Sequence, residues 1–149
     1  MKGFTLIELM VTVAIMAIIA AIAYPSYVQF ILRNNESTVQ ARILELSQAL
    51  EKHKSQNFSY KGFAISTEEV GSPKKYTLNI VGDVTKDVSG VEMTSSIATS
   101  GSGWVIKATP EDSRNATYLM NSQGLKCKNK LSSAVTYLSC GTGAGNEHW

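Results

Sequence analysis

The chain has 149 residues, of which 44% are hydrophobic and 17% are charged, and its formal net charge is +2. This length suits one folded domain and leaves no room for a second one. From Gly62 onward the 8 basic and 8 acidic residues cancel. The overall charge therefore does not predict an acidic partner.

The sequence lacks the residue patterns that are typical of enzymes. It contains no glycine-rich phosphate loop and no Cys-His or Ser-His-Asp set with a supporting motif. Its two histidines, His53 and His148, lie far apart, and no metal ligands cluster in the sequence. We therefore expect no enzyme, no metal site and no cofactor.

The first residues carry a nearly continuous apolar run. Between Phe4 and Tyr24 there are 21 residues, interrupted only by Thr5, Glu8 and Thr12. About 20 apolar residues are enough to cross the core of a bilayer. We therefore expect a helix that can span a membrane.

The basic and small residues of this region, Lys2 and Gly3, come before the apolar run. In a cleavable secretory signal, the small residues of the cleavage site come after it. Cleavage after Gly3 would therefore leave the apolar helix on the mature protein.

Glu8 is an ionisable residue inside the apolar segment. A carboxylate at this depth is costly unless a cation or water neutralises it, which makes Glu8 a candidate functional residue. The alternative is that Glu8 lies in the headgroup region of the membrane without a specific partner.

The first 30 or so residues closely resemble the class III signal of type IV pilins. The resemblance rests on Lys2-Gly3, the following FTLIELM, and an apolar helix that ends in AYPSY. In that family a prepilin peptidase cleaves after the glycine and methylates the new N-terminal amine. The resemblance thus implies cleavage after Gly3 and methylation of Phe4. An ordinary membrane anchor is the alternative, but it explains neither Gly3-Phe4 nor the position of Glu8.

The resemblance also implies how subunits assemble. The equivalent glutamate of pilins pairs with the N-terminal amine of a neighbouring subunit, which here would join Glu8 to Phe4. Pro25 removes one hydrogen bond of the helix and is expected to kink it near Ala21. Many pilins have a helix-breaking glycine eight residues before this proline. This chain has Ala17 there, so the resemblance does not extend to unwinding of the helix at that point.

After Pro25 the sequence becomes amphipathic. Apolar residues recur at the spacing of one helix face, at Leu32, Val39, Ile43, Leu46 and Leu50. We expect one long helix, with its first half in lipid and its second half packed under a globular head. The predicted organisation is a leader at 1–3, a transmembrane and assembly helix at 4–25, an amphipathic helix of the head at 26–54, and a globular β-rich region at 55–149.

The region beyond the helix is rich in β-forming residues. The stretch from residue 57 to 75 contains Gly62, Gly71 and Pro73 and is expected to be a loop. Five candidate strands follow, at 76–81, 90–98, 104–108, 117–121 and 135–140. Trp104, Ile106 and Leu119 are expected in the core, and residues 141–149 are expected to be mobile. The predicted fold class is α+β, a type IV pilin fold in which the long helix packs on a small antiparallel sheet.

Cys127 and Cys140 are the two cysteines and lie 13 positions apart. If the residues after Tyr24 lie outside the inner membrane, their compartment is oxidising and a disulfide is expected. A bridge of this span contributes about 3 kcal/mol in the chain-entropy model. A metal pair is the alternative, but the sequence has no C-x-x-C motif and no nearby histidine.

The C-terminal half has a looser resemblance to the minor pilins that include PilE and the DNA-uptake pilin ComP. It rests on WVIKATP at 104–110, TYLMNSQG at 117–124, and Cys127. This resemblance implies that DNA is a candidate partner.

A basic, acid-free stretch lies in the same region, between Ser113 and Asn146. Its basic residues are Arg114, Lys126, Lys128 and Lys130. If residues 126–130 are extended, the three lysines share one face, beside the disulfide loop. Such a patch could hold DNA phosphates. A solvated basic loop is the alternative.

We therefore expect a structural subunit of a type IV pilus, most like a minor pilin, that supports adhesion, twitching motility or DNA uptake. It would be an inner-membrane precursor and then part of an extracellular pilus. Its expected partners are other pilin subunits, prepilin peptidase and the inner-membrane assembly machinery. Two alternatives stay open. One is a type II secretion pseudopilin, which usually lacks the YPSY junction and the C-terminal cysteine pair. The other is a DNA-binding receptor whose filament role is secondary.

Overall fold

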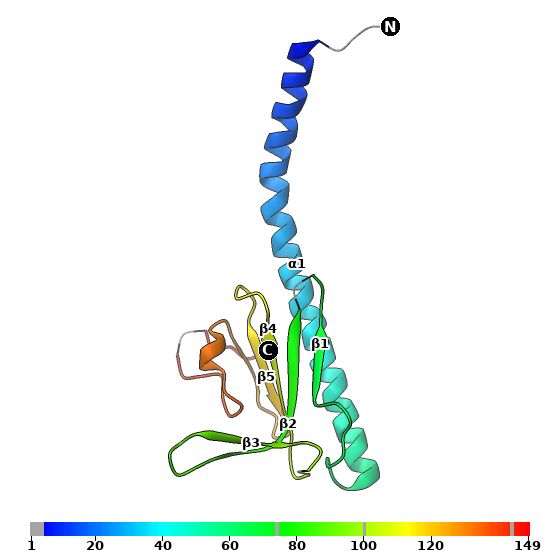
Figure 1. The fold of residues 1–149 in the computed structure, drawn as a ribbon, viewed down its shortest axis with the longest axis vertical. Coiled ribbons are helices and arrows are strands. Elements are labelled where there is room, and N and C mark those ends of the chain that lie inside the picture. The colour runs from blue at the N-terminus through cyan, green and yellow to red at the C-terminus, as the bar shows by residue number, and fades with distance from the viewer. Residues whose placement is uncertain (1–4, 74, 100, 144) are drawn as a thin grey trace. The chain divides into compact units, whose positions relative to one another are not determined.

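The computed structural model describes residues 5–73, 75–99, 101–143 and 145–149. One long helix comes first, and strands follow it (Figure 1). The elements are α1 (Leu6–Asn57), β1 (Thr67–Val70), β2 (Tyr76–Lys86), β3 (Glu92–Ser96), β4 (Val105–Pro110), β5 (Thr117–Asn121), β6 (Lys126–Asn129) and the 3-10 helix η1 (Ser132–Ala134). The chain divides into two compact units, Met1–Asn34 and Asn35–Trp149.

The first unit is the apolar part of α1. Thr5 caps its start, because the Thr5 Oγ1 accepts a hydrogen bond from the Glu8 N–H at 3.3 Å. The segment is long and apolar enough to cross a membrane, with a mean hydropathy of 2.6 over its most apolar window, and none of that window is buried. The helix continues through Pro25. The expected kink near Ala21 stays a prediction.

The second unit begins on the amphipathic part of α1. The predicted apolar stripe is confirmed here, because Val39, Ile43, Leu46 and Leu50 are all buried. Their spacing places them on one face of the helix. That face packs against the sheet and forms one side of the larger core.

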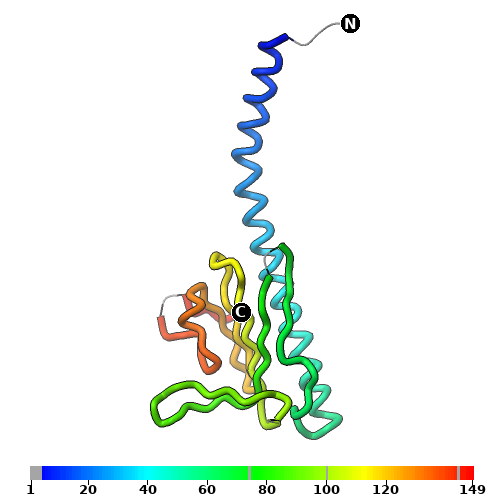
Figure 2. Tube along the Cα trace, viewed as in Figure 1, coloured from blue at the N-terminus to red at the C-terminus, as the bar shows by residue number. Residues whose placement is uncertain are grey.

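All strand pairings between the named strands are antiparallel, in the order β1-β2-β4-β5-β6, with β3 paired to the far end of β2. A register shift between Val81 and Val84 interrupts the β2–β3 ladder. Such an irregularity bends and twists a strand. The β2–β3 hairpin accordingly swings away from the rest of the sheet (Figures 1 and 2).

The sheet has an apolar cluster on each face. On the helix face Tyr76, Ile106 and Tyr118 join the α1 stripe. On the opposite face Leu119 and Cys127 belong to a smaller cluster under the disulfide loop. Alternation along each strand produces this division, since neighbouring residues point to opposite faces.

Several expectations about the head need correction. Residues 135–140 form no strand; they follow η1 as irregular backbone with bends. The predicted loop at 57–75 contains the strand β1, which pairs with β2 from Thr67 to Val70. The expected strand at 76–81 extends to Lys86, whereas the expected strand at 117–121 matches β5 in full.

Candidate functional site

The strand β6 carries two of the predicted basic residues. The side chains of Lys126 and Lys128 lie on the helix face of the sheet, because these residues pair with Met120 and Tyr118 of β5. Cys127, between them, points to the opposite face. Lys130 lies beyond the end of β6 and is exposed. Lys126 and Lys128 therefore share a face, as the alternation predicts, and that face is opposite to the one on which the Cys127 side chain lies.

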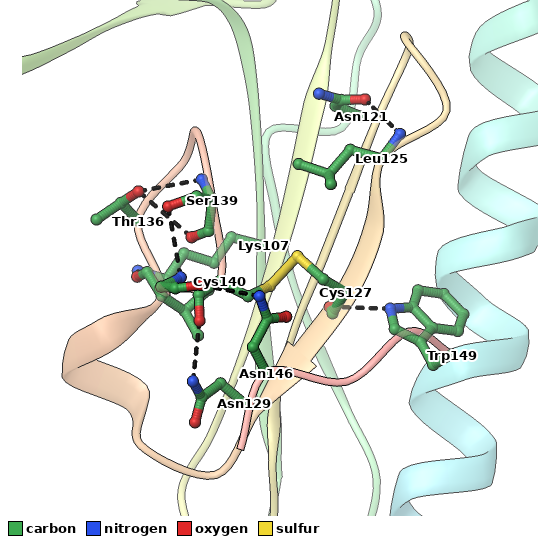
Figure 3. Close-up of a disulfide and its surroundings, with 12 residues drawn as sticks. Lys107, Asn121, Leu125, Cys127, Asn129, Thr136, Ser139, Cys140, Asn146 and Trp149 are labelled. Carbon is green, nitrogen blue, oxygen red and sulfur yellow. Dashed lines mark hydrogen bonds between the residues drawn. A yellow bond between two sulfur atoms is a disulfide. The ribbon is translucent and has the colours of Figure 1, made fainter. Parts of the chain in front are cut away.

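The disulfide lies on the other face of β6. Cys127 and Cys140 are joined, with their Cα atoms 6.0 Å apart, as the sequence predicts for two cysteines in an oxidising compartment. The Asn129 Nδ2 donates to the Cys140 carbonyl at 2.9 Å, which also holds the closed loop to β6. Figure 3 shows this arrangement, with the disulfide on one side of β6 and Trp149 on the other.

A lysine fastens the disulfide loop to the middle of the sheet. The Lys107 Nζ, on β4, donates to the Val135 carbonyl at 2.5 Å and lies 5.3 Å from the centre of the Tyr137 ring. Burial lowers the pKa of the Lys107 ammonium, and the Glu92 carboxylate opposes that shift. Glu92 in turn accepts a hydrogen bond from the Tyr137 N–H. The Lys107 ammonium therefore serves to hold the disulfide loop against the sheet.

The segment Gly145–Trp149 packs against β6, so the expectation of a mobile tail is wrong. The main chains of Lys128 and Glu147 exchange two hydrogen bonds, of 2.8 and 3.0 Å. The Trp149 Nε1 donates to the Cys127 carbonyl at 3.0 Å. The indole also meets the Tyr118 ring edge-on, with the ring centres 5.4 Å apart. The segment thus behaves as a short extra strand on the edge of the sheet.

Folding changes the charge balance of the acid-free stretch. Asp112, just before the stretch, holds the Arg114 guanidinium with two hydrogen bonds, of 3.0 and 2.7 Å. Glu147, just after it, lies 3.1 Å from the Lys128 ammonium. The Lys126 ammonium stands 6.0 Å from the centre of the Trp149 ring. Two of the four predicted basic residues are therefore paired with acids that lie just outside the acid-free stretch.

A second basic group lies at the end of α1, and the sequence analysis missed it. Its members are exposed and form no salt bridge within the part of the chain that the structure describes: Lys52, Lys54 and Lys61. The signal is the sequence from Lys52 to Ser66, which contains no Asp or Glu. Phe58 stands in the middle of this segment with a φ of 56° and is 92% exposed.

The predicted processing and assembly residues belong to the first unit. Gly3 and Phe4 lie outside the described residues, so cleavage and methylation there stay predictions. Glu8 stands in the first turn of α1, where the helix dipole also favours a carboxylate. Pro25 lies within the helix. Among the described residues, no group of three or more His, Cys, Asp or Glu side chains could hold a metal ion.

Comparison with known proteins gives the class first. Residues 1–24 match the prokaryotic N-terminal methylation motif. Together with one long apolar helix packed on an antiparallel sheet, this match defines the chain as a type IV pilin. Residues 25–130 match the family described as type IV minor pilin ComP, DNA uptake sequence receptor, and the chain belongs to that family. The resemblance stated from the sequence is thereby confirmed.

Individual relatives agree with this class. The chain is 41% identical over 63 residues, 42% of its length, to the type IV major pilin protein PilA of Myxococcus xanthus. It is 50% identical over 50 residues to the type IV major fimbrial protein FimA of Dichelobacter nodosus. Over 83 residues, 54% of the chain, it is 34% identical to the type IV wide pilus major component PilA4 of Thermus thermophilus. The matches cover 29%, 32% and 63% of these relatives. No solved structure matches the chain significantly.

Proposed function

We propose that the chain is a minor subunit of a type IV pilus whose head captures DNA. The family match over residues 25–130 is the observation that carries this proposal. In it, residues 1–3 are a leader that prepilin peptidase removes, 4–25 anchor the precursor in the inner membrane, and 26–54 support the head at 55–149. The mature chain then leaves the membrane and joins other pilin subunits in an extracellular filament.

Assembly in this proposal depends on Glu8. In a filament core that resembles lipid, the carboxylate needs a cation at the same depth, and the amine of the mature Phe4 is the nearest one in sequence. A helix cannot fold its own first residue back onto Glu8 with good geometry. The pairing is therefore proposed between neighbouring subunits. Electron microscopy of filaments from a deletion strain tests the class of subunit: complete loss indicates a major pilin, fewer pili a priming minor pilin, and normal pili an accessory one.

We propose that DNA binds along the edge of β6, at the three lysines Lys126, Lys128 and Lys130. Same-face side chains on a strand repeat about every 6.6 Å. Lys126 and Lys128 have this spacing on β6, and Lys130 follows directly after the strand. The three ammonium groups are thus close enough to contact phosphates of one DNA strand together. The Trp149 ring beside Lys126 adds an aromatic surface to this edge.

The charge pairing refines which residues would carry the contact. Arg114 is held by Asp112, so we leave it out of the proposed DNA contact, although the sequence made it a candidate. Lys128 is paired with Glu147, and the side chain of Glu147 is 64% exposed. Lys126 and Lys130 form no salt bridge with any residue that the structure describes. A phosphate can therefore approach the edge without breaking a buried ion pair.

The test compares two triple substitutions with the same change of charge. Binding of the full chain to labelled duplex DNA would be measured by fluorescence anisotropy in a neutral detergent at several salt concentrations. Each lost phosphate contact lowers the log-log salt slope by about 0.9. The triple variant Lys126→Gln, Lys128→Gln and Lys130→Gln should therefore have a slope that is lower by roughly 2 to 3. The matched control, Lys52, Lys54 and Lys61→Gln, should leave the slope largely unchanged.

Two other results would overturn parts of the proposal. If the control alone lowers the slope, DNA binds at the end of α1, where Phe58 is also exposed, and the β6 assignment is wrong. If the unsubstituted chain shows no binding even at low salt, the head is a structural subunit without DNA affinity. The pilus-subunit part of the proposal would survive that second result, because it rests on the methylation motif at residues 1–24 and on α1.

A further inference from the structure

In the segment Gly145–Trp149 the main chain is held by hydrogen bonds to β6, whereas the Glu147 side chain is exposed. The two main-chain bonds between Lys128 and Glu147 set its register on the edge of β6. Gly145 has a φ of +99°, and a Cβ there would lie 2.9 Å from the Asn129 Oδ1. Trp149 is anchored to the Cys127 carbonyl (Figure 3). The path of this segment is therefore well defined on both sides of Glu147.

The Glu147 side chain is different from its backbone. Its carboxylate lies 3.1 Å from the Lys128 ammonium, yet the side chain is 64% exposed, whereas that of Lys128 is 27% exposed. Rotation about the Glu147 side-chain torsions can take the carboxylate into water without breaking a main-chain bond. The Glu147 carboxylate thus contacts the Lys128 ammonium where a phosphate would, and it can leave that position at a small cost in free energy.

We propose that Glu147 is a built-in competitor of DNA at the β6 edge. A phosphate oxygen replaces the Glu147 carboxylate at the Lys128 ammonium, while the backbone bridge and the Trp149 anchor remain in place. Glu147 thereby weakens binding to any polyanion and keeps Lys128 neutralised when no DNA is present. This inference rests on the proposed DNA-binding function and concerns the regulation of that same site.

The experiment measures duplex DNA affinity of the full chain in neutral detergent at low salt. Glu147→Gln should tighten binding roughly 1.5- to 5-fold, which is the range expected for loss of an exposed ion pair. The gain should fade as salt rises, because salt screens the pair. Glu69→Gln is the matched control. It removes an acid from the exposed Lys75–Glu69 pair on β1, at the opposite end of the strand order, with the same change of net charge.

A Lys128→Gln background completes a double-mutant cycle. Glu147→Gln should have no effect on affinity in that background, because the freed partner is missing. Equal tightening by Glu147→Gln and Glu69→Gln would reduce the effect to net charge and overturn the inference. So would tightening that persists without Lys128, or no change in a chain that binds DNA. If neither the unsubstituted chain nor the Glu147→Gln variant binds, the proposed DNA function itself fails and this inference falls with it.

Discussion

Cys127 and Lys128 are neighbours in the chain, but their side chains lie on opposite faces of the sheet. The sulfur atom of Cys127 is bonded to that of Cys140 in the disulfide, whereas the Lys128 ammonium faces Glu147 on the helix side of β6. Alternation along a strand enforces this separation. Stability of the loop and charge at the proposed DNA edge can therefore be changed independently.

Removal of the disulfide should destabilise the head without abolishing the DNA edge. We expect Cys127→Ser with Cys140→Ser to lower the free energy of unfolding by roughly 2 to 5 kcal/mol. The cause is the additional freedom that the unfolded chain gains when the loop is no longer closed. Urea unfolding of the full chain in detergent, followed by tryptophan fluorescence, measures the change.

The single variant Cys127→Ser is the control for side-chain packing. It loses the same bridge but leaves a thiol at Cys140, which is 1% exposed, so its cost should be similar. Two thiols that can be alkylated in native protein before reduction would contradict the disulfide. A large loss of DNA affinity in the folded double variant would contradict the independence of the two faces.

The parts of the head that the sequence predicted well are those with strong local periodicity. The apolar face of α1 is set by residues such as Val39, Ile43 and Leu46, whose spacing only a helix can bring together. β5 was predicted to the residue because polar and turn-forming residues bound it on both sides. In both cases the local pattern and the tertiary packing agree.

The misses come from contacts that are distant in sequence. The pattern TEEV in β1 is not typical of a strand, and pairing with β2 decides its structure. Residues 135–140 look β-forming, but the disulfide at Cys140 and the Lys107 contact to Val135 hold them as a loop. The pairing of Lys128 with Glu147 spans 19 positions. No local pattern in the sequence indicates it.

Glu8→Val should leave the precursor stable and processed but poorly incorporated into filaments. Valine removes the cost of a carboxylate in the apolar helix and so favours residence in the membrane. It also removes the proposed partner of the Phe4 amine. The amount of the variant in sheared filaments, relative to the membrane fraction, measures incorporation.

Glu8→Gln separates charge from shape in this experiment. Glutamine keeps nearly the same volume and stays compatible with the Thr5 cap at the helix start, yet it cannot form the ion pair, so it should fail in the same way as valine. Substitution of Gly3 should instead retain the leader, which mass spectrometry detects. Normal amounts of either Glu8 variant in filaments would rule out the proposed ion pair.

The head should lose stability at alkaline pH because of its buried tyrosines. Burial raises the pKa of Tyr118 to about 12, although a hydrogen bond from Gln40 opposes the shift, and burial also raises the pKa of Tyr76. In the unfolded chain these groups ionise near pH 10. Their protonated forms therefore favour the folded state fully below pH 10. The contribution of Tyr118 is lost as the pH rises from about 10 to 12, and that of Tyr76 is also lost only above pH 10.

Tyr118→Phe tests this dependence. The variant should lose less stability between pH 10 and 12, by up to roughly 3 kcal/mol, which corresponds to a pKa shift of about two units. Urea midpoints at a series of pH values measure the difference. Lys107 has the opposite sign: its lowered pKa makes stability rise with pH up to about 10.5. A fall of equal size in the variant would show that Tyr118 is not the cause.

Lys130 should contribute one phosphate contact that no internal acid competes for. It is exposed beyond the end of β6, and no salt bridge of Lys130 is found among the described residues. Lys130→Gln should therefore lower the log-log salt slope of DNA binding by about 0.9. Lys75→Gln removes the same charge from a lysine that is paired with Glu69 at 2.6 Å, and it should leave the slope unchanged. Fluorescence anisotropy at several salt concentrations measures both slopes. If the two variants lower the slope equally, the effect is one of general charge. If neither lowers it, Lys130 contacts no phosphate. Either result contradicts the prediction.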